Sequence, residues 1–581
     1  MDDEAVGLSD GAEEGPLASR GVPSRRKRVR PASPPALRVC LLGGMVSLRT
    51  EGAMGVGPDA GAPPRLSLFR MNLLACSPDG TRCYVASNDV LYVYRVLAGR
   101  TVDPVPVAFV PFDRARWDRL REDEAAGAPG AAGAGRGPGS WSGSGSDDED
   151  GGDGGGGRQS AFINLVRCGG PRGSPLGASV AVCRQNDCVQ VMVSAGTQGQ
   201  EDWGWDAWTV VDTNPPGPMR RGGDDALGTW SLGLSPVDGR VVMGSNANRV
   251  AAVDVDVGGT WAGGGASPLV PDAKAILPHK NNVPALDVSP CGRYVASASI
   301  DCYCRVARLG GPPGDPVVTL EVKRKVDDAW GWAVRWVPRD GCASEGLEGY
   351  MLLYATQRDL FLLEAATLKV VGCKREILEE AMQNDPSMAT RWDHHGWHHA
   401  LFDSLNRLAL LEYVPDLSAV LVAPHAADRV FVFRICHASA HKEEEREGNE
   451  EEEREDDEGE EREDDEDEER EDEDDEERED EDEDDDEDDE RRLPYVFEPQ
   501  GMIKSPISNR PRATVVGLAV CQRAAPDSAS GGAQGKVPRG EVLRGGCCAS
   551  VLFLDGTLGM WDISHSPSSL PRVFDVGDRL I

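Results

Sequence analysis

Residues 285–309 read ALDVSPCGRYVASASIDCYCRVARL, and this stretch decides the expected fold. It consists of a short apolar segment, a Ser-Pro-Cys-Gly turn, a second segment that ends in small residues, a polar turn at Asp301 and a third apolar segment. Short apolar runs separated by Gly, Pro, Ser and Asp are typical of antiparallel strands joined by tight turns. The stretch therefore predicts three consecutive strands of one small sheet.

The same unit recurs along the chain. Residues 73–96 and 232–255 repeat it closely, and less regular copies follow the same order of segments and turns. The less regular copies are 162–193, 333–364, 408–435, and 515–522 continued at 549–563. Antiparallel sheets must protect their edges, and radial repetition of small sheets does so. We therefore expect an all-β fold, a seven-bladed β-propeller with long disordered insertions.

Low-complexity stretches interrupt these units. Each is too poor in apolar residues to offset the entropy lost on ordering, so we expect disordered tails or loops. The expected tail and insertions are residues 1–62, 121–160, 439–493 and 523–541. A single propeller should then span 63–565, followed by a C-terminal tail at 566–581.

The two ends of the propeller are expected to meet in one blade, because a ring closed by strands from both termini cannot open easily. Two apolar segments near the start could supply the N-terminal strand. They are 66–70 (LSLFR) and 37–41 (LRVCL), and either would complete the blade that contains Trp561.

The charge of the chain is concentrated in one segment. The formal net charge is −38, and residues 443–490 contain 40 Asp and Glu against five Arg. The rest of the chain is nearly neutral, and 40% of all residues are hydrophobic, which is enough for a sizeable core. Because duplex binding needs clustered Lys and Arg, we expect no direct contact with nucleic acid.

The 15 cysteines and the N-terminal segment bear on the cellular compartment. The cysteines lack metal-site or disulfide spacing, which indicates reduced thiols. No signal peptide or long uncharged apolar run is present, so we expect neither secretion nor membrane insertion.

The stretch PSRRKRVRP (23–31) is typical of a nuclear import signal, with a random basic patch as the alternative. Its basic residues are Arg25, Arg26, Lys27, Arg28 and Arg30. We expect the nucleus, and also the cytoplasm, as the location.

The repeats resemble those of WD-repeat proteins, in which a blade runs from a Gly-His pair to a Ser-x-Asp turn and a closing Trp-Asp. Residues 555–557 (DGT) and 561–562 (WD) match this ending. His279 and Asp301 stand near the histidine and turn positions of another unit, although Ala-Arg at 307–308 replaces its Trp-Asp. The resemblance implies structural roles for five residues. They are His279, Asp301, Asp555, Trp561 and Asp562.

A closer resemblance is carried by three stretches in order, 281–309, 327–338 and 406–423. Together they resemble the fungal family of propeller proteins linked to transcriptional control of the ribonucleotide-reductase genes, over about 280–565. The resemblance implies a nuclear regulatory or scaffold role with protein partners. We expect a monomeric propeller.

A histidine cluster raises the possibility of a metal site. Residues 391–401 read RWDHHGWHHAL and hold four of the nine histidines, His394, His395, His398 and His399. Their i, i+4 spacing could chelate zinc on a helix, but Gly396 and Trp397 stand where a metalloprotease needs its Glu. We favour structural or surface histidines over adventitious metal binding and over a functional metal site, and predict no resident metal.

Two tryptophan-rich segments, 201–210 and 327–336, suggest either a peptide groove or core packing. Four residues of the second segment alternate, which would place them on one face of a strand packed against the next blade. They are Trp330, Trp332, Val334 and Trp336. Core packing is the favoured interpretation.

These patterns predict a nuclear WD-repeat-like scaffold for protein–protein interaction in transcriptional regulation. Two alternatives remain open: a histone-binding or chaperone-like propeller that uses 443–490, and a substrate receptor of a ubiquitin ligase. No nucleophile elbow, Walker loop or zincin motif is present, so we expect no enzyme and no cofactor.

Ser146, followed by four acidic residues, is a candidate phosphorylation site of the casein kinase II type.

Overall fold

The structure, a computed structural model, describes the strands and turns of the repeated units. The described residues are 36–50, 63–64, 66, 70–78, 80–97, 101–111, 163–169, 179–184, 189–194, 208–213, 229–237, 240–246, 248–254, 274–309, 318–326, 329–339, 346–377, 407–424, 427–438, 493–504, 514–522 and 546–566. All of them belong to the unit Pro35–Ile581. Among them, no helix is long and apolar enough to cross a membrane.

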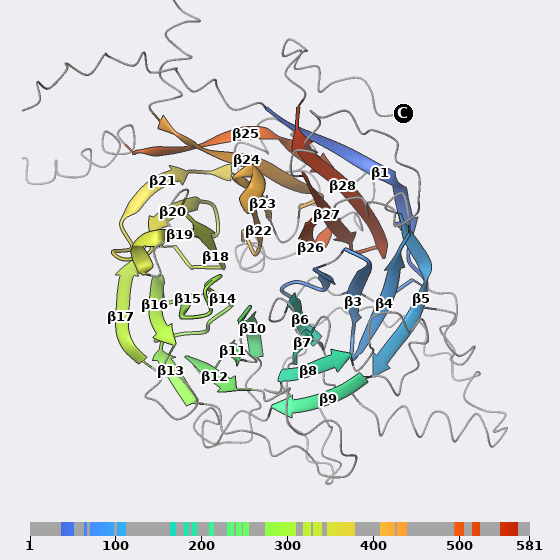
Figure 1. The fold of residues 1–581 in the computed structure, drawn as a ribbon, viewed down its shortest axis with the longest axis horizontal. Coiled ribbons are helices and arrows are strands. Elements are labelled where there is room, and N and C mark those ends of the chain that lie inside the picture. Colours follow the sequence, from blue (N-terminus) through green and yellow to red (C-terminus); the bar gives the residue numbers. More distant parts are fainter. Residues whose placement is uncertain are drawn as a thin grey trace, which may run out of the picture. The chain divides into compact units, whose positions relative to one another are not determined.

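The described strands form seven four-stranded antiparallel sheets, here called blades 1 to 7 (Figure 1). Blade 1 holds β2 (Leu74–Cys76), β3 (Arg82–Ser87), β4 (Val90–Val96) and β5 (Val102–Pro111). Blade 2 holds β6 (Ile163–Gly169), β7 (Ser179–Arg184), β8 (Val189–Ser194) and β9 (Trp208–Thr213). Blade 3 holds β10 (Thr229–Leu234), β11 (Arg240–Ser245), β12 (Arg249–Asp254) and β13 (Lys274–Pro278). Blade 4 holds β14 (Ala285–Val288), β15 (Tyr294–Ala298), β16 (Tyr303–Leu309) and β17 (Val318–Lys325).

The remaining blades follow the same order. Blade 5 holds β18 (Ala333–Pro338), β19 (Tyr350–Ala355), β20 (Leu360–Glu364) and β21 (Val370–Lys374), and blade 6 holds β22 (Leu410–Val414), β23 (Ala419–Ala423), β24 (Arg429–His437) and β25 (Tyr495–Lys504). Blade 7 holds β26 (Val515–Gln522), β27 (Gly546–Phe553), β28 (Thr557–His565) and β1 (Leu37–Ser47). Each repeated unit expected from the sequence lies within one blade, and the predicted all-β propeller class is confirmed.

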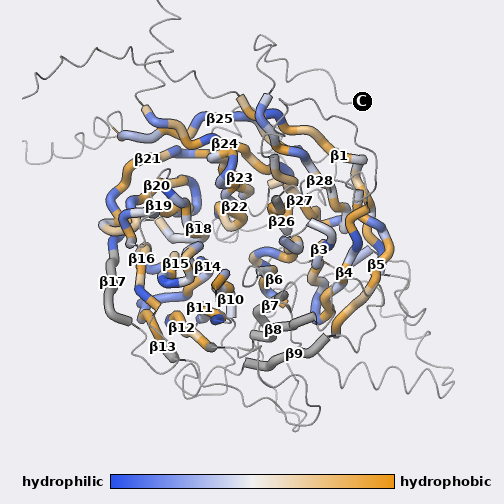
Figure 2. Tube along the Cα trace, viewed as in Figure 1, coloured by the Kyte–Doolittle hydropathy of each residue, from blue (hydrophilic) through white to orange (hydrophobic). Residues whose placement is uncertain are grey.

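The Ser-Pro-x-Gly turns explain why the first two strands of a unit fold back on each other. The Ser77 Oγ accepts the Arg82 N–H at 3.0 Å, and the Ser289 Oγ accepts the Tyr294 N–H at 3.0 Å. The glycine of the blade 4 turn, Gly292, has a φ of 71°, which a residue with a Cβ adopts only at a cost. Hydrophobic stretches recur in the coloured strands of Figure 2, and the buried apolar residues pack as clusters between adjacent blades.

Hydrogen bonds connect each blade to the next around the whole ring. In order from blade 7 to blade 1 and onward, they are Leu73 N to Val516 O, Val166 N to Asn72 O, Asn164 Nδ2 to Thr229 O, Ser231 Oγ to Val283 O, Trp336 N to Asp287 Oδ2, Leu408 N to Thr356 O and Val515 N to Ala427 O. Each interface between successive blades thus has at least one hydrogen bond, and the described blades form a closed ring.

The N-terminal strand β1 closes blade 7 by pairing antiparallel with β28, in a register that runs from Leu37↔His565 to Ser47↔Thr557. The prediction that 37–41 completes the blade of Trp561 is confirmed, and the alternative at 66–70 is wrong. The expected propeller start at 63 is also wrong, since the fold already uses 37–47. A bulge at Gly43 and Gly44, with φ of 62° and 90°, lets this glycine-containing segment pair as a strand.

The acidic residues 443–490 lie in the sequence between β24 and β25, two strands that pair with each other up to the point where this segment begins and ends. Strands β24 and β25 pair up to His437↔Tyr495, and the Ala438 N–H donates to the Pro494 carbonyl at 2.8 Å. The two ends of the insertion are thus held together as in a hairpin. The expected insertions at 121–160 and 523–541 lie outside the described residues, as do 439–492 of the expected insertion 439–493 and 567–581 of the expected tail 566–581.

Candidate functional site

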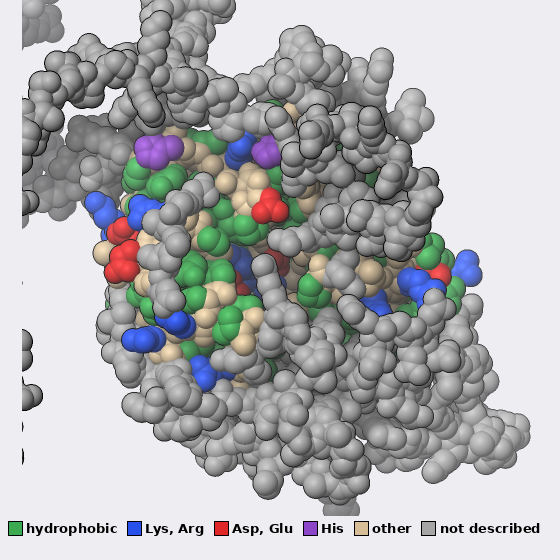
Figure 3. All heavy atoms as spheres, viewed as in Figure 1, with side chains coloured by type: hydrophobic (Ala, Val, Ile, Leu, Met, Phe, Trp, Pro, Cys, Tyr) green, Lys and Arg blue, Asp and Glu red, His purple; other side chains and the backbone are tan. Residues whose placement is uncertain are grey.

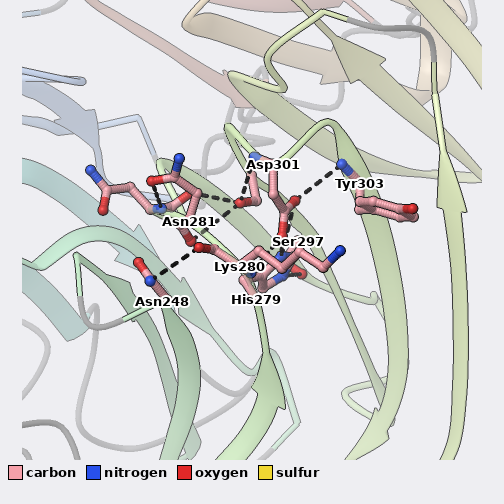
Figure 4. A network of polar contacts seen from close by, with 9 residues as sticks. Asn248, His279, Lys280, Asn281, Ser297, Asp301 and Tyr303 are labelled. Carbon is pink, nitrogen blue, oxygen red and sulfur yellow. Dashed lines mark hydrogen bonds and ion pairs between the residues drawn. The ribbon is translucent and has the colours of Figure 1, made fainter.

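A buried network of His279, Ser297 and Asp301 lies in blade 4 (Figure 4). The His279 ring contacts the Asp301 Oδ2 through Nδ1 at 3.1 Å and the Ser297 Oγ through Nε2 at 2.9 Å. Nδ1–H donates to the carboxylate, which leaves Nε2 to accept the Ser297 hydroxyl proton in the neutral imidazole. The sequence prediction singled out the histidine and the aspartate but not the serine between them.

These residue types are those of a nucleophilic triad, but their burial gives them a structural role. Ser297 is 0% exposed and lies on the middle strand β15, so a substrate cannot reach its hydroxyl. Burial favours a raised pKa for Asp301, but hydrogen bonds from His279 and from the Lys280 and Tyr303 N–H groups outweigh it and lower the pKa to about 2. The network therefore fixes the segment before β14 to the turn between β15 and β16.

The Asp-Gly-Thr and Trp-Asp residues of blade 7 take similar local roles. The Asp555 Oδ1 accepts the Thr557 N–H at 2.9 Å and its hydroxyl at 2.6 Å, which shapes the turn into β28. Trp561 is buried and packs edge-on against Phe553, and the Asp562 Oδ2 accepts the Ser564 hydroxyl at 3.1 Å. These contacts stabilise the blade that closes the ring.

A second polar cluster, here called the channel cluster, consists of Arg167, Asp287, Arg335 and Glu412. One oxygen of Glu412 accepts Arg167 Nη1 at 2.8 Å and Arg335 Nη2 at 3.1 Å. Arg167 lies on β6 and Glu412 on β22, blades that are not neighbours in the ring, so this pair joins them across the centre. Figure 3 shows basic and acidic side chains within the hollow in the middle of this face.

Asp287 belongs to the same cluster and binds the neighbouring blade. Its Oδ2 accepts the Trp336 N–H at 3.1 Å, and its carbonyl accepts the Trp336 Nε1–H at 3.0 Å. Burial raises the pKa of Asp287 to about 7 and outweighs the lowering effects of Arg167 and the Trp336 N–H, while Glu412 raises it further. Burial likewise raises the pKa of Glu412, opposed by Arg167.

The raised pKa of Asp287 predicts a pH-dependent stability. Because the folded state holds this proton up to about pH 7 and an unfolded Asp releases it near pH 4, the free energy of unfolding should fall as pH rises between these values, by up to about 1.4 kcal/mol per pH unit. Asp287→Asn keeps an acceptor for the Trp336 N–H but does not titrate. Urea unfolding at pH 5, 6 and 7 should show a flatter dependence for this variant, and parallel curves would contradict the assignment.

The tryptophans of segment 327–336 take different positions. Only 333–338 form the strand β18, in which Val334 and Trp336 are buried. Trp332 is 7% exposed and Trp330 is 40% exposed, so the predicted packing of all four residues on one strand face is wrong for Trp330. The two rings meet edge-on with centroids 6.3 Å apart, and the Arg407 guanidinium lies 4.2 Å from the Trp332 centroid.

Several predicted site residues lie outside the described part of the chain. These are the metal candidates His394, His395, His398 and His399, the import residues Arg25, Arg26, Lys27, Arg28 and Arg30, and the phosphorylation candidate Ser146. Among the described residues, no group of three or more His, Cys, Asp or Glu could hold a metal ion.

The sequence prediction missed the channel cluster. Asp287, Arg335 and Glu412 are each the third residue of the first strand of their blade, in ALDV, AVRWVP and LLEYV. A charged residue inside a short apolar strand is costly unless it is paired. The recurrence of such residues at the same place in successive units was a signal for a shared polar centre.

The chain shares one stretch of sequence with a known repeat protein. No family model matches the chain. The chain is similar to a WD40 repeat-containing protein of Dictyostelium discoideum, with 29% identity over 112 residues, which are 19% of this chain and 14% of that protein. It is also similar to a chain in the crystal structure of a mitotic checkpoint complex, with a TM-score of 0.41 and 11% identity over 96% of this chain and 98% of that chain. The ring of blades, the His–Ser–Asp network and the local match define a WD-repeat-like β-propeller.

Proposed function

We propose that this protein is a nuclear scaffold that binds other proteins of a regulatory complex on the exposed surface of its propeller. The class of fold supports this proposal, because WD-repeat-like propellers offer a rigid ring whose loops can bind partners. The buried serine of blade 4 and the ion-paired centre of the ring favour binding at the surface over catalysis inside it.

The observation that carries the proposal is the aromatic group of Trp330, Trp332 and Arg407. Trp330 is exposed over 40% of its surface, and Trp332 beneath it is held by the stacked guanidinium of Arg407. An exposed indole fixed by a rigid aromatic–cation stack loses little conformational entropy on binding. Trp and Arg are also the residues most enriched in binding hot spots.

Affinity purification of tagged protein from nuclei tests the proposal. Trp330→Ala should remove at least one partner that the unmodified chain retains, with a loss of about tenfold or more in recovery, as expected for a hot spot of about 1.4 kcal/mol. Leu97→Ala is the matched control, because Leu97 is equally exposed at 41% but lies in blade 1. An unchanged set of partners with Trp330→Ala, or a set made only of metabolic enzymes, would contradict the proposal.

The regulatory role and the location rest on sequence features. The resemblance to the fungal propeller family supports transcriptional control of ribonucleotide-reductase genes, and PSRRKRVRP (23–31) supports nuclear import. Replacing the five basic residues of that motif by Ala should move the protein from nucleus to cytoplasm. Loss of the protein should change the expression of these genes, and unchanged transcripts would contradict this part of the proposal.

Binding of a polycationic partner, such as a histone, is the second candidate function. It is favoured by the charge of −35 that residues 443–490 carry. It is also favoured by the hydrogen bond between the Ala438 N–H and the Pro494 carbonyl, which holds the two ends of the insertion together beside blade 6. Deleting 440–492 and joining the ends with a short turn leaves the strand pair intact. Loss of histone binding with unchanged partner recovery would support this function, whereas unchanged histone binding would exclude it.

A further inference from the structure

Four of the described cysteines gather where blade 7 meets blade 1, an interface here called the seam. Cys76 and Cys83 lie on β2 and β3 of blade 1, and Cys521 and Cys548 lie on β26 and β27 of blade 7. All four are buried in one hydrophobic cluster. The Cys76 Sγ lies 3.5 Å from the Cys83 Sγ and donates to the Ser550 Oγ at 3.3 Å. The seam thus contains a pair of thiols in direct contact.

The strand register places Cys76 and Cys83 in a geometry that a disulfide can bridge. The two residues lie opposite each other, and the next pair along the strands is hydrogen-bonded, with the Ser77 N–H donating to the Arg82 carbonyl. Cys76 and Cys83 are therefore a non-hydrogen-bonded pair, in which Cα atoms lie about 4.5 Å apart. A disulfide spans this separation and needs its sulfur atoms about 2.05 Å apart. Both cysteines are reduced in this structure.

We propose that Cys76 and Cys83 are an oxidation site at which hydrogen peroxide produces an intramolecular disulfide. Cys76 is 8% exposed and Cys83 is 0% exposed, so Cys76 reacts first. Its thiolate sulfur attacks one peroxide oxygen, the O–O bond breaks, and water leaves with the thiol proton, which yields a sulfenic acid. The Cys83 sulfur then attacks the Cys76 sulfur, the S–O bond breaks and a second water leaves. Two thiols and one peroxide thus give one disulfide and two waters.

Opening of the seam controls the rate of this reaction. Hydrogen bonds with Cys521 and Cys83, together with burial, raise the pKa of the Cys76 thiol, so the reactive thiolate is scarce while the seam is closed. Local opening of one interface costs less than global unfolding and exposes Cys76 to the oxidant. Cys83 stays beside Cys76 on the same hairpin when the seam opens, whereas Cys521 belongs to blade 7 and moves away. Cys83 is therefore the partner that forms the disulfide.

The side chain of Asn72 holds the seam closed. Its Nδ2–H donates to the Leu518 carbonyl at 2.8 Å, and its Oδ1 accepts the Leu518 N–H at 3.1 Å. Asn72→Ala removes both of these hydrogen bonds to β26 and should speed disulfide formation about tenfold or more. Ser231→Ala is the control, because it removes the 2.8 Å hydrogen bond to the Val283 carbonyl between blades 3 and 4, and it should leave the rate unchanged.

The test treats the reduced full-length chain with hydrogen peroxide, alkylates the remaining thiols and maps the peptides. Trypsin cleaves after Arg82 and so separates the two cysteines, and the disulfide then links two peptides. The Cys76–Cys83 link should form in the unmodified chain and equally in Cys548→Ser, which removes another thiol of the same cluster. Cys83→Ser should instead leave a sulfenic acid at Cys76, which dimedone present during the oxidation traps.

Three results would overturn the proposal. One is a folded chain in which Cys76 and Cys83 stay reduced at a peroxide concentration that links them in the urea-unfolded chain. Another is a link from Cys76 to Cys521 in the unmodified chain, which would make the disulfide a bond across the seam. Equal acceleration by Asn72→Ala and Ser231→Ala would show that oxidation follows global unfolding rather than opening of the seam. The Cys76–Cys83 link, accelerated by Asn72→Ala alone, would establish the oxidation site.

Discussion

A chain truncated after residue 548 is expected to aggregate rather than to lose one local function. The cut removes all of β28 and most of β27, which together supply the centre of blade 7. It leaves β1 and β26 without the strands between them, so two edges become available for pairing with other chains.

The truncation also removes one side of a buried cluster. Ala549, Phe553, Trp561 and Ile563 pack with residues of blade 6 such as Val430, which would become exposed. Removal of several buried side chains at about 2–5 kcal/mol each exceeds the 5–15 kcal/mol stability of a typical domain.

Light scattering after gel filtration measures this result. The truncated chain should appear as soluble aggregates or in the insoluble fraction. A chain that ends at residue 566 is the control, because it keeps every described strand, and it should remain monomeric. A truncated chain that stays monomeric and unfolds cooperatively would show that blade 7 is not needed to close the fold.

Trp336→Ala is expected to give the largest loss of stability of any single substitution considered. Trp336 is 4% exposed, packs edge-on against Tyr350 at 5.6 Å and joins blade 5 to blade 4 through Asp287. Replacing such a residue by Ala costs about 3–5 kcal/mol because it leaves a cavity and removes a hydrogen bond. Urea unfolding should show this loss in the free energy of unfolding.

Two comparisons separate the parts of that effect. Trp336→Phe keeps most of the ring packing but loses the Nε1–H bond to the Asp287 carbonyl, so the loss should be only about 1–2 kcal/mol. Trp330→Ala should change stability by less than about 1 kcal/mol, because Trp330 is half-exposed. Similar losses for Trp330→Ala and Trp336→Ala would contradict the positions of the two rings.

The repeated units and their turns could be predicted because their signals are local. Turn residues such as Gly292 and the apolar runs between them lie within a few residues of each other. The contact between His279 and Asp301 was also within reach, because both lie in one unit with a known spacing. The N-terminal strand was found as an alternative only, since Gly43 and Gly44 make its sequence look like part of a low-complexity tail.

The channel cluster could not be predicted in the same way. Arg167 and Glu412 are 245 residues apart, and only the closure of the ring brings them within 2.8 Å. Trp330 was assigned to a strand by its alternation with Trp332, but β18 begins only at Ala333. The order of apolar and polar residues within a segment thus predicts that the segment forms a strand. The residues at which the strand begins and ends, and its contacts with distant residues, depend on the neighbouring blades.

Closure of the ring by β1 and β28 is the central feature of the fold, and an engineered disulfide tests that pairing directly. Ser47 lies opposite Thr557, and the Leu48 N–H donates to the Gly556 carbonyl next to them. Ser47 and Thr557 therefore form a non-hydrogen-bonded pair, in which Cα atoms lie about 4.5 Å apart and a disulfide can form. Both substitutions to Cys change side-chain volume little.

Ser47→Cys with Thr557→Cys should form an intramolecular disulfide under mild oxidation, identified by mapping the linked peptides, and the linked protein should be more resistant to urea. Ser47→Cys with Ser564→Cys is the matched control, because Ser564 pairs with Arg38 at the far end of the strand, roughly 23 Å away, and no link should form. Linkage of residue 47 to residue 557 in the monomer is the expected result. A folded monomer in which both introduced thiols stay free would contradict closure of the ring by its N-terminal strand.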